Sequence, residues 1–468
     1  MSKPPNNFAA FELTDEENSF TRSTNSKGYQ GNPKDTYLRW IVVLLASFLV
    51  FGNDYCYDLP QALEIPLQEK FNINEVKYNL LYTVYSLPNI ILPFVGGYIL
   101  DYFGVKVGII LYNLLIITGQ SLFTLGCYTG NYNLLIIGRS VFGTGAESLN
   151  VAQSMIVTMW FKGKELSTAL GISLCICRLG SSLNNYLSPL FFERFHNIGH
   201  VSFIGLFFVV ISLLCGFGLI HMDEKYLKDE QYTVEEKIEI KDIKKLKKNF
   251  WLLYANAILC FMSFFSFLNI SNKYIQKRFN LSSTVAGGLL IIPYSVAGVL
   301  TPILSYLVDK KGKKATLLIL TCFILSYNHF SLAAIPDSNN GSYAVVLPLI
   351  LFGVFFAFYT ALLIPCISII ADEKVLGTAM GIIYSGQNTG LALGPLIVGG
   401  ILSDESKLLS EYPEMSTVLG MTSFIAACFA IANWYYDKRF NNGQLQKSMK
   451  ELESPTHKNS SEVEVGGV

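Results

Sequence analysis

Two oppositely charged residues lie deep within long apolar stretches of the sequence. At 1.5 Å per residue of helix, Glu147 lies about 16 Å and Arg178 about 18 Å from the nearer end of its stretch. An ionised side chain at such a depth costs roughly 2.5–3.5 kcal/mol, so each charge needs a partner or a function. A carboxylate binds an ammonium group, and a guanidinium binds a carboxylate through two parallel hydrogen bonds. Glu147 and Arg178 together therefore suit a small zwitterion.

Each of these two residues has small or polar neighbours on its own helical face. The neighbours are Gly143, Asn150 and Ser154 for Glu147, and Ser181, Ser182 and Asn185 for Arg178. Two interpretations stay open. The pair is a structural salt bridge between consecutive helices, or it is a binding site with one anion and one cation. The two overlap, because in an empty site the side chains can hold each other.

Three further charged residues lie in or near the apolar stretches of the first half. Arg139 is about 12 Å from Glu147 along the same helix. It is either a gating residue that pairs with Asp58 or a structural residue. Asp54 and Asp58 lie near the outer end of the first stretch, where solvation by water is easier.

The second half has no full charge deep in an apolar stretch, so we expect it to supply neutral polar groups. Tyr384 and Asn388 share one face of a helix and are candidates for a cavity lining. Another face carries small residues at every fourth position, which favours close packing of helices. These residues are Gly386, Gly390 and Gly394.

The composition defines the class of protein that must position these residues. Of 468 residues, 51% are apolar and only 15% charged, and the formal net charge is zero. An average soluble domain is about 25% charged. The balance excludes a disordered chain, which needs high net charge, and a nucleic-acid binder, which needs a basic excess. A membrane protein with many spans remains.

Twelve apolar stretches are long enough to cross a bilayer, because about 20 residues are needed. They cover residues 39–57, 78–100, 107–127, 133–158, 166–192, 200–221, 251–270, 284–308, 314–334, 343–371, 376–402 and 416–436. Backbone amides in hydrocarbon must pair internally, so these stretches are helices. We predict an all-α membrane protein with twelve transmembrane helices.

A repeated Asp-x-x-Gly motif divides the chain into two halves. Asp101 and Gly104 follow the second stretch, and Asp309 and Gly312 follow the eighth, 208 residues later. In each motif the Asp can pair with the end of a neighbouring helix or with a basic residue. Such a contact can break and re-form as the halves move, so we assign these four residues to gates. The predicted organisation is a tail (1–37), a six-helix bundle (38–222), a linker (223–250), a second bundle (251–440) and a tail (441–468).

The distribution of Lys and Arg predicts the orientation. With a cytosolic amino terminus, the inner loops carry 16 of these residues and the outer loops 7. Both termini are therefore predicted to be cytosolic, and both tails flexible. The linker is either an amphipathic helix on the membrane surface or a solvated connector. We interpret the nine cysteines as small buried apolar residues. Because their spacing matches no metal-ligand motif, we expect no metal and no cofactor.

The paired motifs resemble the signature of the major facilitator superfamily. A segment of the fourth stretch is similar to that family's Arg-x-x-x-Gly-x-Gly motif. It reads Gly138-Arg139-Ser-Val-Phe-Gly143-Thr-Gly145-Ala146. The resemblance covers all twelve stretches and implies the twelve-helix fold of that family.

Several segments of residues 38–190 resemble a lysosomal dipeptide uniporter family within this superfamily. The segments begin at Tyr55, Leu80, Gly145, Trp160 and Arg178. The resemblance implies export of dipeptides, notably cationic ones, without ion coupling, and a glycosylated lysosomal membrane protein as accessory partner. It places Glu147 and Arg178 at the peptide termini. Asp58 then leaves room for a cationic side chain, and Tyr57, Tyr82 and Tyr85 are cavity aromatics.

Some features depart from that family, and alternatives stay open. The amino-terminal tail lacks the Leu-Leu pair of the family's sorting signal, and Asn280 and Asn340 begin possible glycosylation sites. A proton-coupled carrier of an amino acid or organic anion is the first alternative. A non-transporting receptor or scaffold is the second. An enzyme is not expected, and the sequence does not decide between a monomer and a homodimer.

Overall fold

The computed structural model describes residues 36–92, 100, 102–161, 166–226, 246–338, 342–371, 376–404, 408–448 and 451. Within these ranges the regular structure is entirely helical. The predicted linker helix, Asp101, Asn340 and most of the two tails lie outside the described residues. The side chain of Asp309 is also outside them, although its backbone is helical.

The helices form two consecutive sets along the chain. The first set is α1 (Leu38–Tyr57), α2 (Leu59–Ala62), α3 (Glu64–Phe71), α4 (Glu75–Ser86), η3 (Pro88–Ile90), α6 (Val105–Thr129), α7 (Tyr132–Phe161), α8 (Leu166–Phe195) and α9 (Ile198–Tyr226). The second set is α10 (Lys248–Phe279), α11 (Ser283–Leu289), α12 (Ile291–Lys311), α13 (Lys314–Ala334), α14 (Val346–Ile370), α15 (Leu376–Ile401), α16 (Leu408–Phe440) and η7 (Gln444–Gln446).

Helices occupy all twelve predicted apolar stretches, which confirms the all-α class. Eight helical segments of the described chain are long and apolar enough to cross a membrane. Two stretches differ from a single straight helix. The second is broken after Ser86, where Pro88 begins a 3-10 turn, because proline disrupts helix hydrogen bonding. The eighth is divided into α11 and α12 at Leu290.

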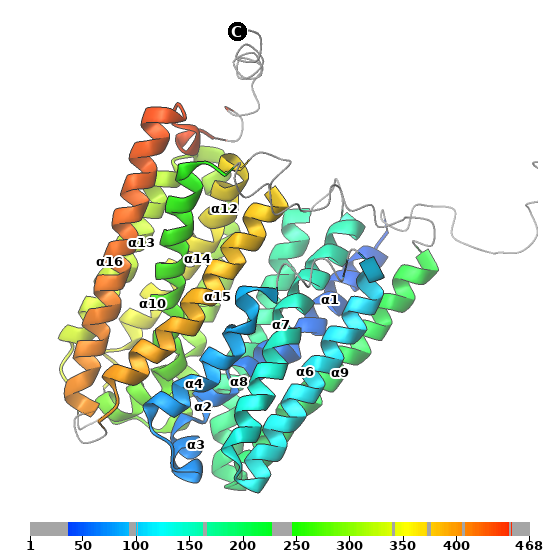
Figure 1. Cartoon of the computed structure of the whole chain (residues 1–468), viewed down its shortest axis with the longest axis vertical. Helices are drawn as coiled ribbons and strands as arrows, with labels where there is room; N and C mark the ends of the chain where they lie inside the picture. The colour runs from blue at the N-terminus through cyan, green and yellow to red at the C-terminus, as the bar shows by residue number, and fades with distance from the viewer. Residues whose placement is uncertain are drawn as a thin grey trace, which may run out of the picture.

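The two sets lie side by side and lean apart toward one end of the molecule (Figure 1). We call this the linker end, because α9 stops there at Tyr226 and α10 begins there at Lys248. We call the opposite end the short-helix end, because α2, α3 and α11 lie there. The sets contact each other through α4 with α15, α8 with α11 and α12, and α2 and α3 with α10.

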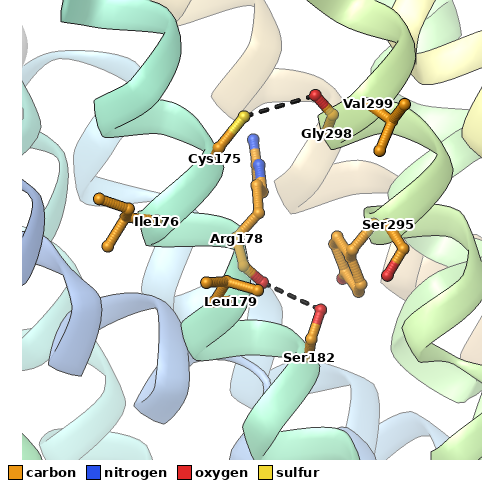
Figure 2. A pocket seen from close by; sticks show the side chains of 9 residues that line it. Cys175, Ile176, Arg178, Leu179, Ser182, Ser295, Gly298 and Val299 are labelled. Carbon is orange, nitrogen blue, oxygen red and sulfur yellow. Dashed lines mark hydrogen bonds between the residues drawn. The ribbon is translucent and has the colours of Figure 1, made fainter.

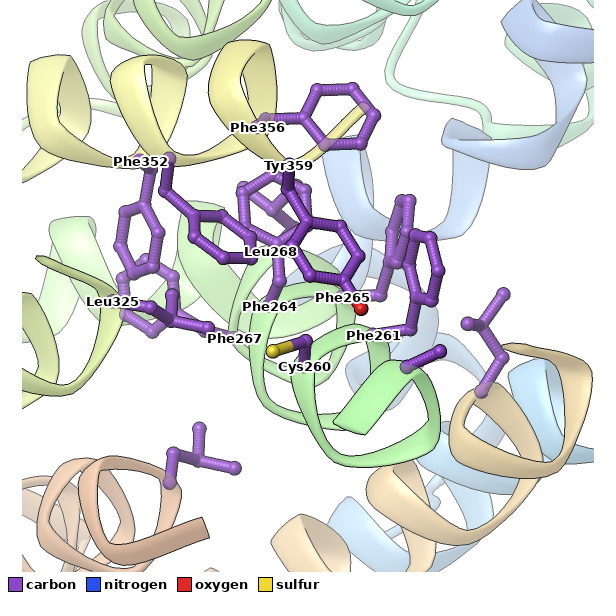
Figure 3. Packing of buried hydrophobic residues seen from close by; sticks show 14 of the residues in the cluster. Cys260, Phe261, Phe264, Phe265, Phe267, Leu268, Leu325, Phe352, Phe356 and Tyr359 are labelled. Carbon is purple, nitrogen blue, oxygen red and sulfur yellow. The ribbon is translucent and has the colours of Figure 1, made fainter. Parts of the chain in front are cut away.

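Apolar packing links the sets at the short-helix end. One buried cluster stays within the first set and includes Val42, Ile109 and Trp160. The other fills the second set but also takes in Leu63 and Leu67 of the first. Its centre is a group of stacked and edge-on aromatic rings on α10 and α14 (Figure 3). The closed end is therefore stabilised by continuous burial of apolar surface.

The glycines of the two Asp-x-x-Gly turns share a positive φ and the same backbone hydrogen bond. Gly104 has a φ of 84° and Gly312 a φ of 67°, a region that glycine adopts without strain. Each glycine N–H also donates a 2.9 Å hydrogen bond to the carbonyl four residues earlier, Leu100 or Val308. This correspondence supports the internal repeat, and the gating role of both turns stays a prediction.

The beginning of the predicted carboxy-terminal tail is folded. After α16, residues 441–448 turn back over the linker end of the second set, and Leu445 is fully buried. The Lys313 N–H donates to the Gln446 carbonyl at 2.9 Å, and the Leu445 N–H donates to Asp437 Oδ2 at 3.1 Å. The prediction of a flexible tail from residue 441 is wrong for these residues, because backbone hydrogen bonds and one apolar anchor hold them.

The glycine stripe of α15 packs against α10, as predicted. A Cβ added at Gly390 would lie 2.6 Å from the Ile258 carbonyl oxygen and 3.0 Å from the Met262 nitrogen. Real Cβ atoms do not approach backbone atoms this closely. At Gly400, on the same helix, an added Cβ meets nothing within 4 Å.

We predict that Gly390→Leu lowers the free energy of unfolding by about 1–3 kcal/mol through overpacking. The matched variant Gly400→Leu should unfold like the wild type. Thermal unfolding of the purified protein in detergent measures both variants, and equal midpoints for the two would contradict the close packing of α10 and α15.

Candidate functional site

Glu147 lies in the middle of α7 and is held by neutral polar groups. The Tyr85 hydroxyl donates to Glu147 Oε1 at 3.3 Å, and the Asn150 side chain is a second hydrogen-bond partner. Glu147 is only half-buried although it is far from both ends of its helix. Its carboxylate is thus oriented but keeps capacity for another donor.

Arg178 lies on α8 at the contact between the two sets (Figure 2). It lines a pocket of about 310 Å³ between α8 and α12, together with Ser182 and Tyr294. Its Cζ atom is 4.8 Å from the centre of the Phe356 ring of the second set, a cation–π distance. The buried Nε atom has no hydrogen-bond partner. The guanidinium is therefore positioned by an aromatic ring and has unused donors.

Glu147 and Arg178 interact electrostatically but form no ion pair within 4 Å in the described structure. The salt-bridge interpretation is therefore not what this conformation contains. Each side chain instead uses different neighbours and leaves part of its charge uncompensated. A ligand with one ammonium and one carboxylate group would fill both requirements.

Two carboxylates of α1 complete the charge cluster. Asp54 and Asp58 are one helical turn apart and both interact electrostatically with Arg178. Asp58 accepts a 3.3 Å hydrogen bond from the Tyr294 hydroxyl, and Ser181 is another partner. Arg178 thus interacts electrostatically with three carboxyl groups, counting Glu147, but none of the described ion pairs within 4 Å includes it.

Asp58 is buried, although solvation is expected to be easier near the end of the first apolar stretch. Only 2% of its surface is exposed. The chain continues from α1 directly into α2 and α3 at the short-helix end. The carboxylate is compensated by Tyr294, Ser181 and Arg178 instead of by water.

Arg139 is satisfied by the backbone. Its guanidinium donates to the carbonyls of Cys56 and Tyr57, both at 3.2 Å, and to that of Leu81 at 3.4 Å. Four rings lie with their centres 5.1–5.6 Å from its Cζ atom, those of Tyr57, Tyr82, Tyr85 and Phe142. Arg139 forms no ion pair with Asp58 in the described residues. This environment supports the structural interpretation of Arg139.

The predicted cavity tyrosines pack against one another and against Arg139. Tyr57 and Tyr85 are edge-to-face at 4.8 Å, and Tyr57 and Tyr82 at 5.8 Å. Their faces are occupied by the protein's own cation, Arg139. Tyr85 also contacts Glu147, whereas Tyr82 is fully buried. Tyr85 is the one of the three with a direct link to the charge cluster.

Tyr384 and Asn388, the two predicted site residues of α15, differ in exposure and in partners. Tyr384 is 41% exposed and interacts electrostatically with Glu147, so it faces the charge cluster. Asn388 is buried and donates to the Tyr384 carbonyl at 3.0 Å, while its Oδ1 atom has no partner. In this conformation the Asn388 side chain hydrogen-bonds only within its own helix, and its role in the site stays a prediction.

Three residues of the cluster were absent from the predicted site: Asp54, Tyr294 and Phe356. The spacing of four residues between Asp54 and Asp58 places them on one face and was a usable signal. No comparable signal marked Tyr294 or Phe356, because apolar helices contain many aromatic residues.

Hydrogen bonds between the two sets concentrate at the short-helix end. Gln61 donates to Ser271 at 3.3 Å, and the Tyr78 hydroxyl donates to the Asn269 carbonyl at 2.8 Å. Toward the linker end, the described bonds between the sets reach only as far as Cys175 with Gly298 and Ser385 with Ile90. The charge cluster is therefore closed from the short-helix end.

Comparisons with known proteins agree with this architecture. The family model of the Major Facilitator Superfamily matches residues 43–395. The lysosomal dipeptide transporter MFSD1 of Bos taurus is 32% identical over 81% of this chain and 83% of its own length. The protein of the same name from Homo sapiens is 30% identical over 89% of this chain and 90% of its own length.

Solved structures show the same fold. The nucleoside transporter NupG has a TM-score of 0.68 at 13% identity, covering 86% of this chain and all of that one. A structure from a study of proton dependent oligopeptide transporters has a TM-score of 0.66 at 14% identity, covering 86% of this chain and 99% of that one. With the family match and the relatives, the chain belongs to the major facilitator superfamily and is a membrane transporter.

Proposed function

We propose that this chain is a uniporter that exports dipeptides from the lysosome to the cytosol by alternating access. The observation that carries the proposal is the pair of buried, opposite charges that are oriented but not paired with each other. Arg178 binds the peptide carboxylate through its free donors, and Glu147 binds the peptide ammonium. The relatives named as lysosomal dipeptide transporters support the substrate and the compartment.

The second set closes the site around the peptide. Phe356 holds the Arg178 guanidinium, and Tyr294 and Tyr384 face the carboxylates of the first set. In this proposal the linker end is cytosolic, as the Lys and Arg bias predicts, and both termini lie there. The present conformation is then closed toward the lumen, and Asp101 and Asp309 belong to cytosolic gates.

Two parts of the proposal rest on the family resemblance alone. One is a glycosylated accessory protein of the lysosomal membrane as partner. The other is the absence of ion coupling. A homodimer and glycosylation at Asn280 or Asn340 stay predictions.

The charge balance favours peptides with a cationic residue. Asp54, Asp58 and Glu147 interact with Arg178, and Asp58 also interacts with Arg139. Three carboxyl groups thus share two guanidinium groups, so a zwitterion alone leaves an excess of one carboxyl group in a region of low dielectric. A lysine or arginine side chain on the peptide neutralises part of this excess. We propose that Asp54 and Asp58 form the subsite for that side chain.

The same excess of carboxylates is the observation that favours a second candidate, a proton-coupled carrier of a small solute. A proton could neutralise one of the three carboxylates in place of a cationic side chain. The two candidates differ in energy source. Transport that needs a pH gradient supports the proton-coupled carrier, and transport at equal pH on both sides supports the uniporter.

We predict that Arg178→Ala abolishes saturable uptake of labelled lysyl-alanine into proteoliposomes with equal pH on both sides. The reason is the loss of the guanidinium that interacts with Asp54, Asp58 and Glu147 and has an unused donor. Arg194→Ala, an exposed position on the same helix, is the matched control and should transport normally. Normal uptake by Arg178→Ala would remove Arg178 from the site.

We predict that Glu147→Gln weakens the binding of peptides with a free amino terminus more than the binding of N-acetylated peptides. Losing a charge-assisted hydrogen bond costs about 1.5–3 kcal/mol, roughly 10- to 100-fold in affinity. Competition of both peptide types against labelled substrate measures the difference. An equal loss for the two would contradict the assignment of Glu147 to the ammonium.

We predict that Asp54→Asn reduces the preference for lysyl-alanine over alanyl-alanine. Removing one carboxylate lowers the negative excess that the cationic side chain neutralises, so the ratio of kcat/KM values should fall several-fold. Uptake of both peptides by Asp54→Asn and wild type gives that ratio. An unchanged ratio would show that the side chain binds elsewhere.

A further inference from the structure

A second cluster of charged residues lies at the short-helix end, away from the peptide site. Lys273 of α10 forms an ion pair with Glu75 of α4 and donates a hydrogen bond to Gln68 of α3. All three side chains are nine-tenths or more buried. Because Lys273 belongs to the second set and its partners to the first, the cluster joins the two sets where the molecule is closed.

Glu64, the first residue of α3, is the unexplained member of this cluster. It is only 2% exposed, and neither carboxylate oxygen has a hydrogen-bond partner. Glu75 Oε2 is likewise buried and without a partner. The two carboxyl groups lie within hydrogen-bonding reach of each other. Two ionised carboxyl groups facing each other away from water, of which only Glu75 is paired with a cation, would be strongly unfavourable.

One proton resolves this arrangement. A protonated Glu64 donates an O–H to the free oxygen of Glu75, and Glu75 stays ionised and paired with Lys273. The cluster is then electrically neutral, and the unpaired oxygens of the contact gain a hydrogen bond. The other titratable groups that face Glu64 are hydroxyls, those of Tyr78, Tyr82 and Tyr412.

We propose that Glu64 is a proton-binding site that controls closure of the short-helix end. When the two sets separate there, water reaches Glu64 and the carboxyl group can ionise. When they close, Glu64 must take up a proton to be buried beside Glu75. The proton enters and leaves from the same end, so it regulates the carrier without being transported across the membrane.

The direction of the pH dependence follows from the shift at Glu64. Burial, reinforced by the nearby Glu75 carboxylate and opposed by Lys273, raises the pKa of Glu64 well above its usual range. A group whose pKa is higher in the closed form stabilises that form below its ordinary pKa, near 4.3. The stabilisation is lost as the pH rises through the raised pKa. Acid therefore favours closure, with at most about a tenfold change in the equilibrium per pH unit for one proton.

The inference is separate from the proposed substrate. It needs only two sets of helices that open and close at the short-helix end, and its test needs no peptide. If that end faces an acidic lumen, low pH closes it and commits the loaded carrier to release on the other side. Uniport and dependence on luminal pH are then compatible.

The test is a distance measurement by double electron–electron resonance between labels at Asn131 in the first set and Leu409 in the second. Both positions are exposed. Labels carried by unnatural amino acids avoid the nine native cysteines. We expect the short-distance population to rise as the pH falls from about 8 to about 5. Glu64→Gln, which keeps an N–H donor for Glu75, should show the short distance at every pH.

Glu69→Gln is the matched control, because Glu69 is exposed on the same helix and should leave the wild-type pH profile unchanged. A Glu64→Gln protein that keeps the wild-type pH dependence would overturn the proposal. So would a wild-type distance distribution that does not change with pH, and that measurement does not depend on whether any variant folds.

Discussion

The burial of charge within a bundle of helices is the constraint on which the rest of this structure depends. An ionised side chain far from water must be compensated by the protein, by a proton or by a ligand. Arg139 shows full compensation by the protein, because three backbone carbonyls and four aromatic rings surround its guanidinium. Glu147 and Arg178 have fewer partners and face the junction of the two sets. Arg139 thus has its full set of partners, whereas Glu147 and Arg178 keep unused hydrogen-bonding capacity.

The division of labour between the two halves follows from the same constraint. All the charges of the central cluster belong to the first set, whereas the second set contributes rings and hydroxyls, notably Phe356 and Tyr294. Neutral groups can approach and leave a charged cluster at a smaller electrostatic cost than ions, since they have less solvation to lose. A half that carries mainly aromatic contacts can therefore move past a half that carries the charges. Aromatic stacking between α10 and α14 includes Phe356 itself, which stacks on Phe264.

Much of this arrangement could be predicted from the sequence, for identifiable reasons. Apolar stretches of a length set by the bilayer indicated the helices, and the 208-residue repeat indicated two halves whose turn glycines share a positive φ. Deep charges identified Glu147 and Arg178 because such residues are costly. Depth was misjudged for Asp58, because α2 and α3 extend the first helix beyond the point where hydropathy falls. Phe356 and Tyr294 could not be found, because which of many aromatic residues faces an arginine depends on how two bundles pack. The fold of residues 441–448 was missed because backbone hydrogen bonds leave no mark in composition.

The two charge clusters differ in the side of the molecule with which each can exchange a bound group. In our proposals this difference separates substrate binding at the central cluster from regulation at the short-helix end. The central cluster lies between the halves at mid-depth, so a bound group can enter from one end and leave from the other. The cluster of Glu64, Glu75 and Lys273 lies at the closed end itself, so a proton bound there is released to the side from which it came. Coupling a proton gradient to transport requires a site that is exposed to both sides in turn. A titratable group confined to one gate lacks that property, yet it still changes the equilibrium between the open and closed forms. Buried acids in a transporter are thus evidence for coupling only when their position allows exchange with both sides.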